Sequence, residues 1–243
     1  MLTVYHGSTC RVEQPIAGVC RPNLDFGIGF YVTDLEKQAT RWALRTADIR
    51  HQTEAWLNTY LLDIDFCRTA PYRYLHFENY NADWLDFVVA CRQGSTLWQA
   101  YDIIEGGIAD DRVIRTIDLY IRGDYTREEA LARLVHQEPN NQICIINQEI
   151  IDHHLYFKGS SIISLTNAKE IAPAPADIAM QGKYYGIVEH LATRLHISKD
   201  KALDIFYNSN TYQCLTQQTG DLYLMSDFYI VDEVIRELQD KQG

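Results

Sequence analysis

Short apolar runs alternate irregularly with helix-type apolar stripes over the first 165 residues of the chain. Runs of aliphatic and aromatic residues predict strands at residues 2–5, 30–32, 56–66, 72–77, 101–104, 141–146 and 155–165. Apolar residues at helical spacing predict helices after residue 33, around 84–91, and over 111–121 and 126–136. The order of strands and helices does not follow a regular β-α-β rhythm, so the pattern favours an α+β fold.

Local signals place some of the element ends. Thr33 is followed three residues later by Glu36, and Thr126 is followed in the same way by Glu129. In such a capping box, each side chain satisfies a free backbone amide in the first turn of a helix. We therefore expect a helix to begin at each place, and we expect Gly106-Gly107 to close the strand at 101–104.

A proline-containing segment precedes a helical tail. Residues 169–177 contain two prolines and several small residues, a composition typical of a linker. Beyond this segment, one helical stripe is formed by Tyr184, Ile187, Val188, Leu191 and Leu195. Ser198 is placed to cap a second helix. We expect a first domain over residues 1–168, a linker over 169–177 and a small, mostly α-helical domain over 178–243.

The charge balance narrows the range of partners. The chain of 243 residues has 22 Lys and Arg against 33 Asp and Glu, a formal net charge of −11. Nucleic acids and anionic membranes would repel such a chain, so general binding to either is not expected. The N-terminus lacks the features of a signal peptide, and no apolar run approaches the ~18 residues that span a bilayer.

The cysteines and histidines do not indicate a metal site. The six cysteines form no C-x-x-C pair, and reduced cysteines that pack in a cytoplasmic protein are the expected state. His153 and His154 are adjacent and have no third ligand nearby in the sequence, so no bound metal is expected.

Three short segments combine polar, glycine and aromatic residues in a way that suits a ligand site. They are Tyr5-His6-Gly7-Ser8, the stretch 21–33 and Asn141-Gln142-Ile143-Cys144-Ile145. Taken singly, each has an ordinary structural explanation: a turn after a strand, a bulged entry to a strand, and a polar residue that opens an apolar strand. Their combination and their order are what indicate a function.

In this order, the segments resemble the His-Tyr-Glu form of the ADP-ribosyltransferase clan, which diphtheria toxin and the poly-ADP-ribose polymerases share. The resemblance is closer to a bacterial family of uncharacterised domains in that clan, through residues 5–8, 23–33, 84–87 and 101–111. It covers about residues 1–165 and implies a split antiparallel β-sheet core with flanking helices, and NAD as the substrate. Through residues 222–235, the tail resembles a small helical, antitoxin-like family.

The resemblance implies a role for each polar residue near the chain start. Breaking the nicotinamide–ribose bond leaves positive charge on the ribose, so the site has to hold the leaving amide and orient the ribose. The Gly7 backbone would bind the nicotinamide amide, His6 the adenosine-side ribose and Ser8 the nicotinamide ribose. Tyr31 would stack on the nicotinamide, and Arg21 would meet the pyrophosphate. The cofactor-binding loop would include Asn23, Asp25, Phe26, Gly27 and Gly29.

The third segment departs from the His-Tyr-Glu pattern, because Gln142 stands where a glutamate is expected. The implied catalytic set is therefore His6, Tyr31 and Gln142. An amide can accept a hydrogen bond from a ribose hydroxyl, but it supplies neither a negative charge nor a base. Glu149 and the pair Asp110-Asp111 are other sources of a carboxylate, although acidic residues at a helix start are also explained by the helix dipole.

Three functions remain open at this point. The first is an NAD-dependent ADP-ribosyltransferase that modifies a macromolecular acceptor and is restrained by contact with its own C-terminal domain. In that case a basic rim of the NAD cleft would be covered by Asp227, Asp232, Glu233 and Glu237. The second is a module that binds NAD or a partner without turnover, and the third is an NAD glycohydrolase. Removal of an RNA 2′-phosphate, another activity in the clan, is disfavoured by the acidity of the chain.

Overall fold

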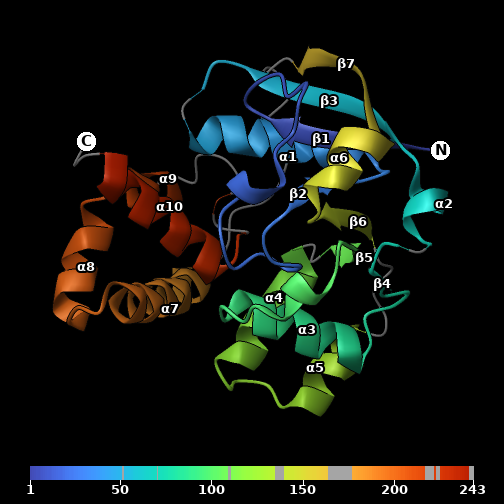
Figure 1. Ribbon diagram of the computed structural model, residues 1–243. Helices are drawn as coiled ribbons and strands as arrows, with labels where there is room; N and C mark the ends of the chain where they lie inside the picture. Colours follow the sequence, from blue (N-terminus) through green and yellow to red (C-terminus); the bar gives the residue numbers. More distant parts are fainter. Residues whose placement is uncertain are drawn as a thin grey trace. The chain divides into compact units, whose positions relative to one another are not determined.

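The computed structural model describes residues 1–50, 52–69, 71–108, 111–134, 140–163, 177–216, 222 and 225–240. The chain divides into two compact units, one formed by residues 1–47 and 52–165 and the other by residues 48–51 and 166–243. All labelled strands in Figure 1 belong to the first unit. The predicted linker lies outside the described residues except for residue 177, where a helix begins. Within the described ranges, no helix combines the length and the hydropathy that a membrane crossing requires.

One sheet of the first unit has three antiparallel strands in the order β1-β3-β7. They are β1 (Leu2–Ser8), β3 (Ala55–Leu62) and β7 (Leu155–Ile163). Helix α1 (Glu36–Ile49) packs through Ala43 and Ala47 against Ala55 of β3. Gly7 of β1 permits this close approach, because a Cβ at that position would lie 2.1 Å from the backbone oxygen of Ala39.

The other sheet has four strands in the order β2-β6-β5-β4. They are β2 (Phe30–Val32), β4 (Tyr74–His76), β5 (Ile103–Ile108) and β6 (Asn140–Ile145). β4 and β5 run parallel, whereas the other pairs are antiparallel. The chain between β4 and β5 contains helix α3 (Ala82–Arg92) and is long enough for a parallel crossover. The expectation of a purely antiparallel core is therefore corrected at this pair.

The two sheets share one apolar core. Both sheets contribute buried side chains to it: the three-stranded sheet contributes Val4 and Tyr60, and the four-stranded sheet contributes Phe30 and Ile143. Helices α6 (Gln148–His154) and α2 (Ile64–Cys67) add buried residues to this core. A second cluster covers the other face of the four-stranded sheet and is formed with α3, α4 (Asp111–Ile121) and α5 (Arg127–Leu134). This mixed packing of two sheets and helices confirms the predicted α+β class.

Two strand ends differ from the sequence pattern for local reasons. β3 ends at Leu62, because the carbonyl of Asp63 accepts a hydrogen bond from Cys67 N–H at 3.1 Å and the chain turns into α2. β5 continues through Gly106-Gly107, which pair with the start of β6. A Cβ at Gly106 would lie 3.0 Å from the ring of Phe26. Glycine is therefore needed here for close packing, and it does not form a turn.

The two predicted capping boxes have different outcomes. The box at Thr126 is confirmed: Glu129 N–H donates to Thr126 Oγ1 at 3.2 Å, and Thr126 N–H donates to Glu129 Oε2 at 2.8 Å. The box at Thr33 is wrong, because α1 begins only at Glu36 and Thr33 pairs with Tyr5 in a bridge between strands. The Thr33 hydroxyl donates to Asn141 O at 2.7 Å, so this residue links strands instead of capping a helix.

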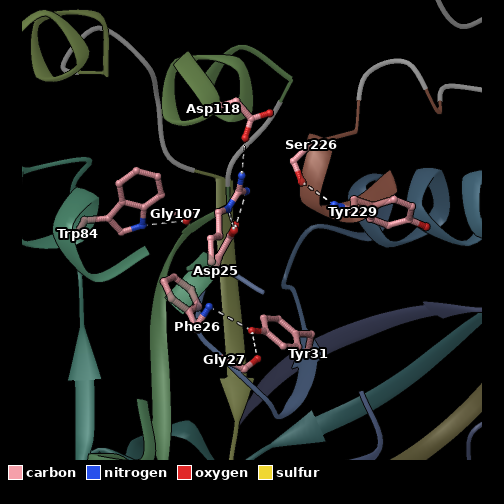
Figure 2. Close-up of polar contacts among 10 residues, drawn as sticks. Asp25, Phe26, Gly27, Tyr31, Trp84, Gly107, Asp118, Ser226 and Tyr229 are labelled. Carbon is pink, nitrogen blue, oxygen red and sulfur yellow. Dashed lines mark hydrogen bonds and ion pairs between the residues drawn. The ribbon is translucent and has the colours of Figure 1, made fainter. Parts of the chain in front are cut away.

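The described part of the second unit after residue 177 is helical. Its α-helices are α7 (Asp177–Leu195), α8 (Lys199–Tyr207), α9 (Asn210–Thr216) and α10 (Asp227–Asp240). The predicted cap at Ser198 is confirmed, since its hydroxyl accepts from Lys201 N–H at 3.3 Å. Ser226 caps α10 in the same way, and Figure 2 shows its bond to Tyr229 N–H, which is 3.1 Å long.

The acidic side chains of α10 have partners inside the second unit. Ion pairs join Asp227 to Lys183, Asp232 to Arg194 and Glu233 to Arg236. Glu237 accepts from the first backbone amides of α9, with Thr211 N–H at 2.7 Å. The structure therefore gives no support to these carboxylates as the cover of a basic rim, and a contact between the two domains stays a prediction.

Candidate functional site

The two sheets of the first unit are joined by a bridge between β1 and β2. Tyr5 N–H donates to Thr33 O at 2.7 Å, and Thr33 N–H donates to Tyr5 O at 3.0 Å. The same antiparallel register, continued along both strands, would place Gly7 opposite Tyr31. The strands separate there, because Tyr31 O accepts a hydrogen bond from His6 Nδ1 at 2.8 Å. The His6 imidazole thus takes the carbonyl to which Gly7 N–H would otherwise bind.

Gly7 directs both of its backbone polar groups into this opening. Along an antiparallel pair, residues alternate between those that bond to the neighbouring strand and those that do not. Tyr5 bonds to Thr33 on the side away from β3, so Gly7 faces the same side. Gly7 is buried, and by this alternation its N–H and C=O point away from β3. Outside the strand pairs, no backbone hydrogen bond joins either group to a described residue. The opening therefore presents one donor and one acceptor side by side.

The His6 ring is held in one tautomer. A carbonyl only accepts, so Nδ1 carries the proton that binds Tyr31 O, and Nε2 is an acceptor in the neutral ring. The ring lies against Phe30, with 4.6 Å between the centroids. Burial lowers the pKa of His6 from its usual 6.5, and the hydrogen bond to Tyr31 offsets this only in part. The imidazole is therefore neutral near pH 7.

The Tyr31 hydroxyl ties the loop before β2 to the strand. It donates to Gly27 O at 2.7 Å and accepts from Phe26 N–H at 3.1 Å, as Figure 2 shows. Burial, and then the nearby Cys144 and Asp25, raise the pKa of Tyr31, so the phenol stays protonated. Because the hydroxyl is engaged with the loop, only the ring of Tyr31 remains for a stacking role.

Replacing Tyr31 by phenylalanine is expected to lower the free energy of unfolding by about 1–3 kcal/mol, the cost of leaving buried polar partners unsatisfied. The partners are Phe26 N–H and Gly27 O. Urea denaturation of both proteins measures the difference. The matched control is Tyr207→Phe on α8, where the side chain is 45% exposed and the change should stay within about 0.5 kcal/mol. Equal losses in the two variants would contradict this role for Tyr31.

A buried ion network fixes the same loop from the side of the helices. Arg92 of α3 lies 2.7 Å from Asp25 of the loop and 3.5 Å from Asp118 of α4. Figure 2 shows the two carboxylates approaching from different segments. The Arg92 and Asp118 residues are 5% and 7% exposed, so the network is shielded from water. Asp25 therefore shapes the loop by binding Arg92.

The other loop residues also have structural roles. Gly27 has a φ of +77°, and a Cβ there would lie 2.1 Å from the Trp98 ring, so glycine is required. Gly29 N–H donates to Cys20 Sγ at 3.2 Å. Phe26 is fully buried in the core, and Asn23 takes a left-handed backbone conformation with φ of +61°. The contact of these residues with a dinucleotide stays a prediction.

Gln142 has a buried acceptor without a partner. The residue is 8% exposed, and its Oε1 has no hydrogen-bond partner among the described residues. In β6 it lies two residues before Cys144, which pairs with Tyr31 in β2. Side chains alternate along a strand, so Gln142 lies on the same face as Cys144 and Tyr31. An unsatisfied buried amide oxygen costs stability, and a ligand donor would relieve that cost.

The structure brings some of the predicted site residues together and leaves others apart. His6, Gly7, Tyr31 and Gln142 lie on the adjacent strands β1, β2 and β6. Their side chains do not share one face, because His6 approaches from the core between the sheets. Ser8 follows Gly7, and its hydroxyl accepts from Cys10 N–H at 3.4 Å. Arg21 lies half-buried in the loop, next to Cys20.

Of the alternative carboxylates, the structure describes only the side chain of Glu149. Glu149 is exposed in the first turn of α6. Asp110 and the side chain of Asp111 lie outside the described residues. His154 stacks on Phe66 with 4.5 Å between centroids, which gives it a packing role. In the part of the chain that the structure describes, no three His, Cys, Asp or Glu side chains form a group that could hold a metal.

A buried carboxylate that the sequence did not indicate lies on β5, beside the start of β6. Glu105 is 4% exposed and accepts from Arg68 at 2.9 Å, from Asn141 Nδ2 at 3.0 Å and from the Tyr74 hydroxyl. Burial acts to raise the pKa of Glu105, but the bonds from Tyr74, Arg68 and Asn141 outweigh it and lower the pKa from its usual 4.5. The side chain is therefore ionised at neutral pH. In the sequence, a lone glutamate in an apolar run gives no sign of these partners.

The fold and this opening define a mixed α+β domain in which two sheets separate beside a glycine and a histidine. The chain belongs to the family described as "Protein of unknown function (DUF3990)", whose family model matches residues 2–157. The family match contains the four-stranded sheet, β1 and β3, and it ends inside β7. Neither a search of curated proteins nor a search of solved structures gave a match.

Proposed function

We propose that the first unit binds NAD and acts as an ADP-ribosyltransferase on a macromolecular acceptor. The observation that supports this best is the unpaired peptide of Gly7 at the opening between β1 and β2. The carboxamide of nicotinamide has an NH2 group that donates and a carbonyl that accepts, so one N–H and the carbonyl can pair with the C=O and the N–H of Gly7. The resemblance of residues 5–8 to the His-Tyr-Glu sites led to the same assignment from the sequence.

In this proposal the neighbouring residues meet the rest of the ligand from two faces of the strands, His6 from one and Tyr31 and Gln142 from the other. The lone pair on His6 Nε2 would accept from a ribose hydroxyl, and the unpaired Gln142 Oε1 would accept from another. The Tyr31 ring would stack on the nicotinamide, while its hydroxyl keeps the loop closed. The half-buried guanidinium of Arg21 would meet the pyrophosphate.

The proposed reaction exchanges one bond for another at the ribose. The bond between ribose C1′ and the nicotinamide nitrogen breaks, and its electron pair leaves with the nicotinamide. A nucleophilic atom of the acceptor then bonds to C1′ and loses its proton to solvent. Gln142 can orient the ribose during this step, but as a neutral amide it cannot stabilise the positive charge as a carboxylate would. We therefore expect a slow enzyme.

The test uses the full chain with NAD labelled on the adenosine side. We expect NAD to bind and nicotinamide to be released slowly, and we expect Gln142→Glu to accelerate the release at least about tenfold through charge stabilisation. The matched control, Gln99→Glu, adds the same charge at an exposed glutamine and should leave the rate unchanged. If neither the wild-type chain nor Gln142→Glu bound NAD, the proposal would be overturned.

The neutral, buried amide of Gln142 also favours a second candidate, a module that binds NAD without turnover. Saturable NAD binding with no nicotinamide release by the wild-type chain would support this candidate. When nicotinamide is released, the fate of the label separates a transferase from an NAD glycohydrolase. Label on a macromolecule indicates transfer, and free ADP-ribose indicates that water is the acceptor.

A further inference from the structure

We propose that Glu105 is a positioning residue: it holds the start of β6 and thereby keeps Gln142 in place. The first part of this inference, that Glu105 anchors β6, concerns the fold alone. The second part, that the anchoring supports NAD chemistry, rests on the function proposed above. Glu105 accepts a hydrogen bond from Asn141 Nδ2 at 3.0 Å, and Asn141 directly precedes Gln142. The carbonyl of Asn141 accepts from the Thr33 hydroxyl at 2.7 Å. Asn141 is therefore held from both neighbouring strands.

The three hydrogen-bonding partners of Glu105 come from three separate segments, none of them its own strand. Arg68 follows α2, Tyr74 is on β4, Asn141 is on β6 and Glu105 itself is on β5. The neighbouring positions on the same face of β5 and β6, Ile103 and Ile143, are fully buried and apolar. Burying a charge in such a place is costly unless every bond is made, so a hydrophobic residue would suit simple stability better. A directed hydrogen bond to Asn141 is what the carboxylate adds.

The position of the Gln142 side chain is set mainly by the backbone of β6. Its Oε1 makes no hydrogen bond with any described residue, so the amide oxygen is not held by a protein donor. Its strand begins at Asn140, and the first residues of a strand are the ones that separate most easily. Glu105 lies beside this end, since Gly106 pairs with Gln142 and Glu105 with Ile143. Loss of the bond to Asn141 would therefore loosen Gln142 before the rest of the sheet.

The far end of the same two strands has a comparable carboxylate that serves as a control. Asp102, just before β5, accepts from Arg73 Nη2 at 3.0 Å and from Asn147 Nδ2 at 3.2 Å. This arrangement, like that of Glu105, joins an acid to an arginine and an asparagine. It lies at the other end of β6, where Ile146 N–H donates to Asp102 O at 2.9 Å. Removing its charge should weaken the fold without moving Gln142.

The experiment exchanges the two partners in the full chain. Asn141→Asp breaks the bond by setting two carboxylates together. Glu105→Gln weakens it, because a neutral amide with a single oxygen replaces a charged acceptor that is shared among Asn141, Arg68 and Tyr74. The double variant restores it, because the new amide at position 105 can donate to the new carboxylate at position 141 and still accept from Arg68 and Tyr74. We expect each single variant to weaken NAD binding or slow nicotinamide release about tenfold, a change of ~1.4 kcal/mol, and the double variant to recover most of the loss.

Hydrogen exchange supplies a readout that does not depend on NAD. The backbone amides of residues 141–143 should exchange faster in each single variant and return to the wild-type rate in the double variant. Asp102→Asn should lower the melting temperature but leave both readouts as in the wild type. Unchanged exchange and unchanged NAD binding in the single variants would overturn the proposal. Failure of the wild-type chain to bind NAD would overturn the functional half alone, and the exchange rates would then decide whether Glu105 anchors β6.

Discussion

Methionine in place of Arg92 is expected to lower the free energy of unfolding by about 3–5 kcal/mol, because the change leaves buried carboxylates without their counter-charge. Asp25 lies 2.7 Å and Asp118 3.5 Å from the guanidinium, and Arg92 is only 5% exposed. The loss should appear as a lower midpoint of urea denaturation. It should also release the loop around Asp25, so NAD binding at the proposed site should weaken with it.

The control is an exposed pair with the same chemistry. Arg127 lies 2.6 Å from Asp86, with side chains that are 41% and 52% exposed. Arg127→Met should cost no more than about 1 kcal/mol, since water screens such pairs. Converting Asp25 and Asp118 to asparagine together with Arg92→Met should recover part of the lost stability. Similar losses for Arg92→Met and Arg127→Met would show that the buried network does not hold the loop.

Alanine in place of Gly7 is expected to destabilise the domain by ~3 kcal/mol or more, through overpacking that the backbone cannot relieve. The added Cβ would lie 2.1 Å from Ala39 O and 2.8 Å from Ala43 N, both on α1. A flexible side chain could move away from a new methyl group, but here β1 or the whole helix has to shift. The melting temperature and the yield of folded protein measure the effect.

Gly18→Ala is the control for this substitution. Gly18 lies in the short helical turn Ala17–Val19, and a Cβ there would meet nothing within 4 Å. This variant should change stability by no more than about 0.5 kcal/mol. A Gly7→Ala protein as stable as Gly18→Ala would show that β1 and α1 are not in the close contact described.

Elements with a strong local pattern could be predicted from the sequence. Phe30-Tyr31-Val32 forms β2 with the predicted bounds, and the apolar spacing from Trp84 to Cys91 predicts α3. Both elements depend on the spacing of apolar residues within a short segment, which can be read directly from the sequence. The capping box at Thr126 is also local, and it is confirmed.

Features that depend on distant partners could not be predicted. The box at Thr33 fails because Tyr5, far away in the sequence, pairs with Thr33. The ionic contact of Glu105 with Arg68 and its bond from Asn141 join residues that are 37 and 36 positions apart. Local propensity carries no information about such contacts, and the parallel pairing of β4 with β5 was missed for the same reason.

The His6 ring has a consequence for what can enter the split between the sheets. A long unpaired strand edge recruits other strands and so invites aggregation. Here the imidazole occupies the Tyr31 carbonyl, the Tyr5–Thr33 bridge closes one side, and Gly7 between them is buried, so the unpaired edge is short and is not exposed. A second chain could not add a strand here, because there is no continuous row of unpaired backbone N–H and C=O groups to bind it. Under the proposed function, a small planar amide would pair with the two backbone groups of Gly7, whereas a whole strand would find too few groups to bind.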